Sequence, residues 1–303
     1  MKNIKSLVIL VSYFEDEVAF MQLILKLKLT GVNFYLVVVD DGSIKKKLTM
    51  EKLSQTDQPG TLIQLKRNSG PQRAIAVGLT YINYEIEAEQ VLIMDSDGED
   101  QPENISTLLN YRTLNPNIDI IVASRLSRKD PIQFKVLYSF YKFLFLLATG
   151  KIMNFGHFSI ISKDAVSRII NYPELWLHLG STYILSKLDI LRVPLPKGNK
   201  YDDRPGSGRL SLISHGIRSI IALSELMISR IFIMGFMAMT ILGVVTLWSF
   251  IAGGGIDIYL GIVGSILILL NTSSTILFLG LSRNAGEYGI SNYQQLIEES
   301  FDF

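Results

Sequence analysis

The sequence predicts an α/β domain with a mainly parallel sheet, followed by an apolar hairpin long enough to cross a membrane. Three observations support this prediction. Short apolar runs alternate with segments of helical periodicity through the first two thirds of the 303 residues. These runs end in polar and acidic residues, as strands do at the ligand-binding edge of an α/β sheet. Residues 231–281 contain one aspartate and no lysine or arginine.

Five runs of aliphatic and β-branched residues are expected to be strands. Each is short and nearly continuous in apolar character, which is typical of strands buried on both faces of a parallel sheet. They are residues 6–14, 35–41, 61–66, 90–95 and 119–124. Segments with helical spacing lie between them at 15–29, 71–84 and 102–114, and the last two begin with proline, which suits the first turn of a helix. This alternation indicates an α/β domain.

The composition limits the classes of function. Hydrophobic residues make up 48% and charged residues 19%, with a mean hydropathy of +0.30 that is high for a soluble enzyme. The net charge of +1 gives no argument for nucleic-acid binding, so we expect no nucleic-acid partner. The chain has no cysteine, which excludes disulfides and thiolate metal sites. The first apolar run lacks a small-residue cleavage site, so we interpret it as a strand rather than a signal peptide.

Two apolar segments near the end of the chain are expected to form a transmembrane hairpin. Residues 231–251 and 258–281 each reach the roughly 20 apolar residues that a bilayer core requires. A short glycine-rich turn, 252–257, separates them. Arg230 and Arg283 flank the pair and the turn has no positive charge, so the positive-inside rule places both ends in the cytoplasm. Two buried helices of a soluble core are the alternative.

Two further helices have an apolar face. Residues 210–229 carry an isoleucine-rich stripe directly before the first spanning segment, which indicates a helix lying in the membrane interface. Residues 134–148 show a similar stripe with Lys135 and Lys142 on the other face, and fit a core-facing or a membrane-facing helix equally well.

The strongest chemical signal is Asp95-Ser96-Asp97 at the end of the fourth run. Two carboxylates one residue apart can hold a hard divalent cation and leave positions open for phosphate oxygens. Such a cation would neutralise a departing diphosphate. The run DSDGED is not an EF-hand loop, because Gly98 is fourth instead of sixth and the twelfth residue is Ser106.

Two other loops carry polar residues with more than one interpretation. Asp40, Asp41 and Ser43 end the second run, and they fit either a plain turn or a carboxylate that binds a base or ribose. Residues 67–73 open a helix, whose N-terminal N–H groups favour anions, and Arg73 adds positive charge. This segment matches neither a Walker loop nor the dinucleotide-binding fingerprint.

In their order along the chain, these segments resemble the family 2 glycosyltransferases with the GT-A fold. The branch that they resemble most contains bacterial polyisoprenyl-phosphate glycosyltransferases and dolichol-phosphate mannose synthase. VSYFE at 11–15 looks like the P-V-Y-N-E of that family, and 39–43 matches V-D-D-G-S. Asn68, Gly70, Ala74 and Gly78 match N-x-G-x-x-x-A-x-x-x-G.

The resemblance continues through the later motifs and covers nearly the whole chain. DSDGEDQPE at 95–103 looks like D-A-D-L-Q-D-P-P-E, and Arg125 falls where the family has an arginine after a strand. Residues 203–209 form a changed version of R-x-x-G-x-S-K. The C-terminal hairpin also fits the bacterial branch.

The resemblance implies roles for these residues and a divalent cofactor, Mg²⁺ or Mn²⁺. The nucleotide-sugar, which we expect to be UDP-linked, would contact Tyr13, Glu15, Asp41, Ser43, Asn68, Arg73 and Asp95. Asp95 and Asp97 would hold the metal, with Asp97 as the direct ligand. Asp97 would thereby be catalytic; Glu99, which stands where the family has glutamine, and Asp100 are further catalytic candidates from their own carboxyl chemistry. Donor or acceptor phosphates would meet Arg125, Arg128, Arg204 and Arg209.

The same resemblance predicts organisation and location. It implies a GT-A domain over 1–209, an interfacial helix at 210–230, the hairpin at 231–283 and a cytoplasmic tail at 284–303. We expect an inverting glycosyltransferase of a bacterial inner membrane with a membrane lipid acceptor, the lipid bilayer as a partner and self-association into a homo-oligomer. The catalytic domain and both termini would be cytoplasmic.

Departures from the family pattern leave the acceptor open. At 154–160, where lipid-phosphate enzymes often show G-D-F-R-L, His157 replaces the acid and Ser159 the arginine. His157 and His178 fit site residues or ordinary packing residues. A polyisoprenyl phosphate needs no base, whereas a glycan hydroxyl needs a general base, for which Glu99 or Asp100 is the candidate. A non-catalytic membrane protein with a decayed transferase domain is the third alternative.

Overall fold

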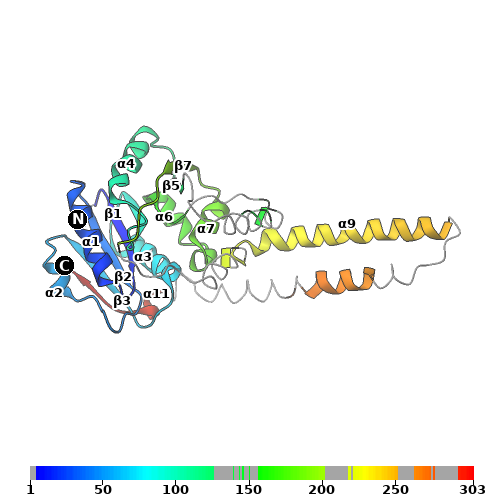
Figure 1. The fold of residues 1–303 in the computed structure, drawn as a ribbon, viewed down its shortest axis with the longest axis horizontal. Helices are drawn as coiled ribbons and strands as arrows, with labels where there is room; N and C mark the ends of the chain where they lie inside the picture. The colour runs from blue at the N-terminus through cyan, green and yellow to red at the C-terminus, as the bar shows by residue number, and fades with distance from the viewer. Residues whose placement is uncertain are drawn as a thin grey trace.

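The structure is a computed structural model in which an α/β domain carries a long apolar helix that projects away from it (Figure 1). The described residues are 5–125, 139, 143, 145–146, 150, 156–201, 218–219, 221–251, 263–273, 276 and 293–303. Most of the expected helix at 134–148, and residues 210–217 and 220 of the expected interfacial helix, lie outside these residues.

The described strands form one eight-stranded sheet in the order β7-β5-β6-β4-β1-β2-β3-β8. The strands are β1 (Val8–Tyr13), β2 (Tyr35–Asp40), β3 (Gly60–Leu65), β4 (Gln90–Asp95), β5 (Ile120–Arg125), β6 (Ser159–Ser162), β7 (Ile190–Leu195) and β8 (Ile297–Asp302). β1 to β4 are mutually parallel, whereas β6 and β8 run antiparallel to their neighbours. The predicted α/β fold is confirmed, and the five predicted strands correspond to β1 to β5.

Helices pack against both faces of this sheet (Figure 1). In the domain they are α1 (Glu17–Leu29), α2 (Met50–Ser54), α3 (Pro71–Glu85), η1 (Pro102–Asn104), α4 (Ile105–Leu114), α6 (Lys163–Ile169), η2 (Pro173–Trp176), α7 (Leu179–Ser186) and α11 (Tyr293–Leu296). Val8 and Leu10 of β1 pack in the core layer that includes α3, while Ile9 and Val11 pack in the layer that includes α1. Burial on both faces explains why the strand sequences are continuously apolar.

One described helix, α9 (Ser224–Ile251), is long and apolar enough to span a bilayer. Its window Phe232–Ser249 has a mean hydropathy of 1.9 and is not buried within the structure. A shorter apolar helix, Val263–Ser273, lies beside it. A Cβ built on Gly235 would collide with Asn271, and one built on Gly264 would meet the Leu242 side chain at 2.7 Å, so the two helices pack antiparallel. The second half of the expected hairpin is described only in part, and its crossing of a membrane stays a prediction.

The segment after the apolar helices returns to the domain. β8 pairs antiparallel with β3, and the backbone N–H and C=O groups of Phe303 exchange hydrogen bonds with Gly60 at 2.8 and 2.9 Å. In α11, the buried Tyr293 stacks on Tyr84 of α3 with ring centroids 6.2 Å apart. The sequence interpretation placed residues 284–303 in a tail outside the domain. Residues 293–303 instead complete one edge of the sheet.

Candidate active site

The carboxyl ends of the parallel strands bring the predicted polar loops to one edge of the sheet. Tyr13 at the end of β1 lies in register with Asp40 of β2, and Ser12 lies in register with Asp95 of β4. The loops that follow these three strands therefore meet, as ligand-binding loops of open α/β sheets do.

Glu15 ties the loop after β1 to the loop after β2. Its carboxylate accepts hydrogen bonds from the backbone N–H groups of residues 44–46 at 2.7, 2.9 and 2.7 Å, which lowers the pKa of Glu15. The N–H of Glu15 donates to the Ser43 hydroxyl at 2.9 Å. The buried Tyr13 hydroxyl donates to the Lys46 carbonyl, and burial raises the pKa of Tyr13. Three predicted nucleotide-contacting residues thus order one loop.

Asp41 joins the loop after β2 to the start of α3. Its two carboxylate oxygens accept hydrogen bonds from the N–H groups of Ser69 and Gly70 at 2.7 and 2.8 Å. Burial raises the pKa of Asp41 to about 6, although these hydrogen bonds and Arg73 act in the opposite direction. Gly42 has a φ of 72°, and a Cβ there would lie 2.4 Å from the backbone carbon of Arg67. The close approach of the two loops therefore requires glycine.

The Asp95–Asp100 loop is held in a tight turn by its own carboxylates. The Asp95 N–H donates to the Asp100 carboxylate at 3.0 Å, and the Glu99 N–H donates to the Asp97 carboxylate at 3.0 Å. Gly98 supplies the positive φ, 91°, at the turn. The loop consequently presents four carboxylates within six residues of chain.

Residues 197–201, here called the strap, cover this loop and neutralise part of its charge. The Lys200 ammonium lies 2.9 Å from the Asp97 carboxylate, and the Lys197 ammonium lies 2.5 Å from the Glu99 carboxylate. These pairs connect the end of β7 to the end of β4. The sequence contains both lysines, but it does not predict their contact with Asp97 and Glu99.

Backbone contacts fix the strap in the same position. The Gly198 N–H donates to the Glu99 carbonyl at 2.8 Å, and the Tyr201 N–H donates to the Asp97 carbonyl at 2.9 Å. A Cβ on Gly98 would lie 2.7 Å from the Tyr201 ring, so the aromatic ring rests directly on the turn. The Lys26 ammonium of α1 lies 4.5 Å from the centre of that ring. Burial raises the pKa of Tyr201 to about 12.

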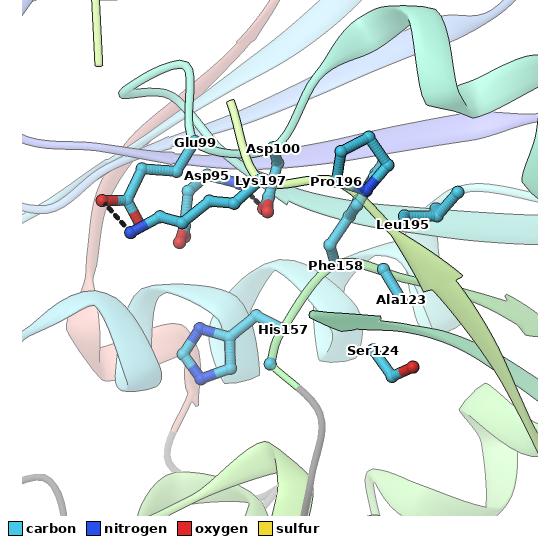
Figure 2. Close-up of a pocket in the computed structure, with 11 residues that line it drawn as sticks. Asp95, Glu99, Asp100, Ala123, Ser124, His157, Phe158, Leu195, Pro196 and Lys197 are labelled. Atoms are coloured by element: carbon cyan, nitrogen blue, oxygen red, sulfur yellow. Dashed lines mark hydrogen bonds and ion pairs between the residues drawn. The ribbon is translucent and has the colours of Figure 1, made fainter. Parts of the chain in front are cut away.

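A pocket lies between this loop, the strap and the start of β6 (Figure 2). Its lining residues are Asp95, Glu99, Asp100, Ala123, Ser124, Gly156, His157, Phe158, Leu195, Pro196 and Lys197. The free volume is about 30 Å³, whereas pockets for organic ligands measure several hundred Å³. Because Pro196 and Lys197 form one wall, a shift of this segment would enlarge the space.

His157 lies across the pocket from the Glu99–Lys197 pair, as Figure 2 shows. The sequence leaves the role of His157 open. Its only signal for a site residue is that His157 lies within the changed G-D-F-R-L segment at 154–160. His178 is buried, and its Nδ1 accepts a hydrogen bond from the Ser181 N–H at 3.0 Å, which caps α7. The structure therefore places His157 at the pocket and gives His178 a structural role.

The carboxylates fit a hard divalent cation, with part of the coordination left to a substrate. Among the described residues, no group of three or more histidine, aspartate or glutamate side chains is arranged to hold a metal ion. Asp95 and Asp97 supply the oxygen donors that Mg²⁺ and Mn²⁺ prefer, and phosphate oxygens commonly complete such a shell. Asp97 is the carboxylate that Lys200 contacts, so a cation bound there would replace that ammonium group.

Several of the predicted site residues are described only in part or not at all by the structure. Asn68 is exposed on the loop before α3. Arg125 ends β5, but its side chain lies outside the described residues. The predicted phosphate-contacting residues Arg128, Arg204 and Arg209 also lie outside them.

Comparison with known proteins gives a family and a fold. Residues 8–170 match the model of Glycosyl transferase family 2. No protein of curated function matches the sequence. The Mycobacterium tuberculosis glucosyl-3-phosphoglycerate synthase, solved with Mn²⁺, UDP-glucose and phosphoglyceric acid, is similar with a TM-score of 0.53 at 12% identity. That match covers 73% of this chain and 79% of the synthase.

Two other solved structures are similar, each to 75% of the chain. The same synthase in complex with phosphoglyceric acid matches with a TM-score of 0.51 at 14% identity, covering 75% of this chain and 80% of that one. Staphylococcus aureus TarS matches at 16% identity with a TM-score of 0.49. The match covers 75% of this chain but only 39% of TarS. At these identities, the synthase structures show a shared fold.

Proposed function

Because the chain belongs to glycosyltransferase family 2, we propose that it is an inverting, metal-dependent enzyme that transfers a sugar from a UDP-sugar to a polyisoprenyl phosphate in a membrane. The observation that carries the proposal is the Asp95–Asp100 loop. It projects four carboxylates at the end of β4, beside a pocket and under two lysines.

The donor site is assigned from the loops that meet at the sheet edge. The two loops fixed by Glu15 and Asp41 form a rigid wall next to β4, and a nucleoside would lie against that wall. Asp95 and Asp97 would hold a divalent cation, which neutralises charge on the leaving diphosphate. The mycobacterial synthase, solved with Mn²⁺ and UDP-glucose, supports this choice of donor and metal.

Transfer needs little acid–base chemistry when the acceptor is a phosphate. The acceptor oxygen is already anionic and attacks the anomeric carbon on the face opposite the diphosphate. The bond from that carbon to the diphosphate oxygen breaks, and the configuration inverts. The protein then contributes by positioning both substrates and by stabilising the departing charge.

A membrane location agrees with the apolar helix. The window Phe232–Ser249 of α9 is exposed along its length, and such a surface is stable in lipid rather than in water. The return of the chain to β8 brings both ends of the apolar segment to the same domain. We infer that the segment enters and leaves the bilayer on the cytoplasmic face, where donor nucleotides are available.

The test is transfer from a panel of radiolabelled nucleotide-sugars to polyprenyl phosphate, with the full chain in membranes and lipid extraction as the readout. We expect transfer from a UDP-sugar, its loss in EDTA and a decrease of at least about a hundredfold in Asp97→Ala. Asp164→Ala changes an exposed aspartate of α6, which begins beside the start of β4 at the opposite end of that strand from the site; this control should stay active. Full activity of Asp97→Ala or in EDTA would contradict the metal assignment.

A hydroxyl of a lipid-linked glycan is the second candidate acceptor, and one observation favours it. Ser159, which stands where lipid-phosphate enzymes often have arginine, is fully buried, and its hydroxyl is hydrogen-bonded to the His157 carbonyl and the Tyr183 hydroxyl. That position therefore offers no cation to a phosphate. Mass analysis of the extracted product distinguishes a sugar on phosphate from a sugar on glycan.

A further inference from the structure

The strap and the Asp95–Asp100 loop form a cluster of opposite charges. Four carboxylates, those of Asp95, Asp97, Glu99 and Asp100, lie within one short loop, and the strap supplies two ammonium groups, those of Lys197 and Lys200. Like charges at this spacing repel each other strongly unless cations lie between them. These carboxylates supply the oxygen donors that a hard divalent cation prefers.

The docked strap also buries a polar group that has no hydrogen-bond partner among the described residues. This group is the Tyr201 hydroxyl. A buried hydroxyl without a partner destabilises the arrangement that contains it. In contrast, the ion pairs are partly exposed, with side-chain exposures of 32% for both Lys200 and Asp97, so each stabilises docking only modestly. Because backbone hydrogen bonds hold Gly198 and Tyr201 on the loop, the partly exposed Lys200 side chain is the part of the strap that can move at little cost.

We propose that Lys200 occupies Asp97 in the donor-free enzyme, competes there with the divalent cation, and moves to the diphosphate of the donor when the cation binds. The inference rests on the proposed function, since it assigns a role at the same donor site. It makes Lys200 a catalytic residue, because in the bound state its ammonium group contacts the leaving group.

From its place in the strap, the Lys200 ammonium group can reach both the Asp97 carboxylate and the diphosphate of the donor. Its ammonium group lies 2.9 Å from the carboxylate that is the predicted direct metal ligand, so a cation at Asp97 displaces it by only a few ångströms, to where the phosphates would lie. An ammonium group released next to a diphosphate gains a charge-assisted hydrogen bond. Gly198, within the strap, approaches the Gly98 carbonyl closely, so the strap backbone stays on the loop and only the Lys200 side chain needs to move.

The proposal predicts opposite effects of one substitution on two affinities. Lys200→Met keeps a long side chain and removes the charge. Because the competitor for Asp97 is lost, Mn²⁺ binding without nucleotide should tighten by about twofold to fivefold. Because the contact with the diphosphate is lost, UDP binding in saturating Mn²⁺ should weaken by about tenfold. Both affinities are measured on the detergent-solubilised full chain, with Mn²⁺ by electron paramagnetic resonance and UDP by calorimetry.

Two further variants serve as controls. Lys163→Met removes a comparable surface ion pair with Glu87, at 3.5 Å, far from the site, and both affinities should stay at the wild-type values. Lys200→Arg keeps the charge and should keep UDP affinity within about threefold of the wild type. It also shows that substitution at this position leaves the fold intact.

The outcomes separate the inference from the proposed function. Unchanged or weaker Mn²⁺ binding by Lys200→Met overturns the competition, and unchanged UDP binding overturns the contact with the diphosphate. If the wild type binds Mn²⁺ but no UDP, the donor assignment fails, and the role of Lys200 at the diphosphate fails with it. Tighter Mn²⁺ binding together with weaker UDP binding in the same variant supports the proposal.

Discussion

Gly42 provides the sharpest test of how the donor wall is built, because Gly31 offers a matched control. Both glycines have positive φ values, 72° at Gly42 and 68° at Gly31. A Cβ at Gly31 would meet nothing within 4 Å. A Cβ at Gly42 would lie 2.4 Å from the backbone carbon of Arg67 and 2.6 Å from the nitrogen of Asn68. Alanine therefore introduces the same backbone strain at both sites and a backbone collision at only one.

The expected magnitudes follow from these distances. The left-handed conformation costs alanine about 1–2 kcal/mol, and a smaller unfolded-state entropy offsets part of this, so Gly31→Ala should lose about 1 kcal/mol. At Gly42, separating two backbone segments adds about 2–3 kcal/mol, as overpacking of a rigid site does. For a domain of this size, thermal midpoints should fall by about 2–4 °C in Gly31→Ala and by about 6–16 °C in Gly42→Ala.

The assay is thermal unfolding in detergent, followed by intrinsic fluorescence of the buried Trp176, together with calorimetry of UDP binding. Gly42 lies between Asp41 and Ser43, whose side chains join the neighbouring loops, so Gly42→Ala should also weaken UDP binding at a temperature where the protein is folded. Gly31→Ala should leave UDP binding unchanged. If Gly42→Ala is no less stable than Gly31→Ala, the close approach of the two loops is not a constraint, and the reasoning fails.

Three other predictions test separate parts of the structure. The native pKa of Asp41 is about 6, above its ordinary value, so the wild type should gain stability relative to Asp41→Asn as the pH falls from 7 to 5; a constant difference in thermal midpoint would contradict this. Phe303→Ala should lower the midpoint by about 3–6 °C, because the ring packs on the sheet edge, and the more exposed Phe301 should matter less in the same assay. Cysteines introduced at Gly254 and Asn292 should react with an impermeant thiol reagent on intact cells at the first position only, and labelling at Asn292 alone would reverse the proposed orientation.

The sequence predicted β1 to β5 and missed β6, β7 and β8. β1 to β5 have continuous apolar runs because both faces are covered. β8 is almost fully exposed and reads IEESFD, so it carries no periodicity that distinguishes it from a tail. β7 contains Pro194, which weakens a strand signal, and β6 is only four residues long. These three strands form because each pairs with a strand that is distant in sequence. The strand propensity of a local segment does not reveal such pairing.

In the candidate site as well, the sequence revealed some features and not others. The Asp95–Asp97 motif could be located because both carboxylates are close in sequence. The contact between Asp97 and Lys200 joins residues that are adjacent only after β7 has packed beside β5, so the sequence could supply the charges but not the pairing. Glu15 was expected to contact the nucleoside. Its three hydrogen bonds to residues 44–46 depend on a backbone turn with a φ of 53°, which a motif does not reveal.

The position of β8 has a consequence for the order in which the protein is made. β3 pairs on one side with β2 and on the other with a strand that the ribosome produces only after both apolar helices. Until then, the outer edge of Gly60–Leu65 has free backbone groups on a buried apolar strand, which is the kind of edge that promotes association between chains. The apolar segment must therefore find its final environment before the sheet closes. A chain stalled between the two events would be more prone to aggregation than either the isolated hairpin or the finished domain.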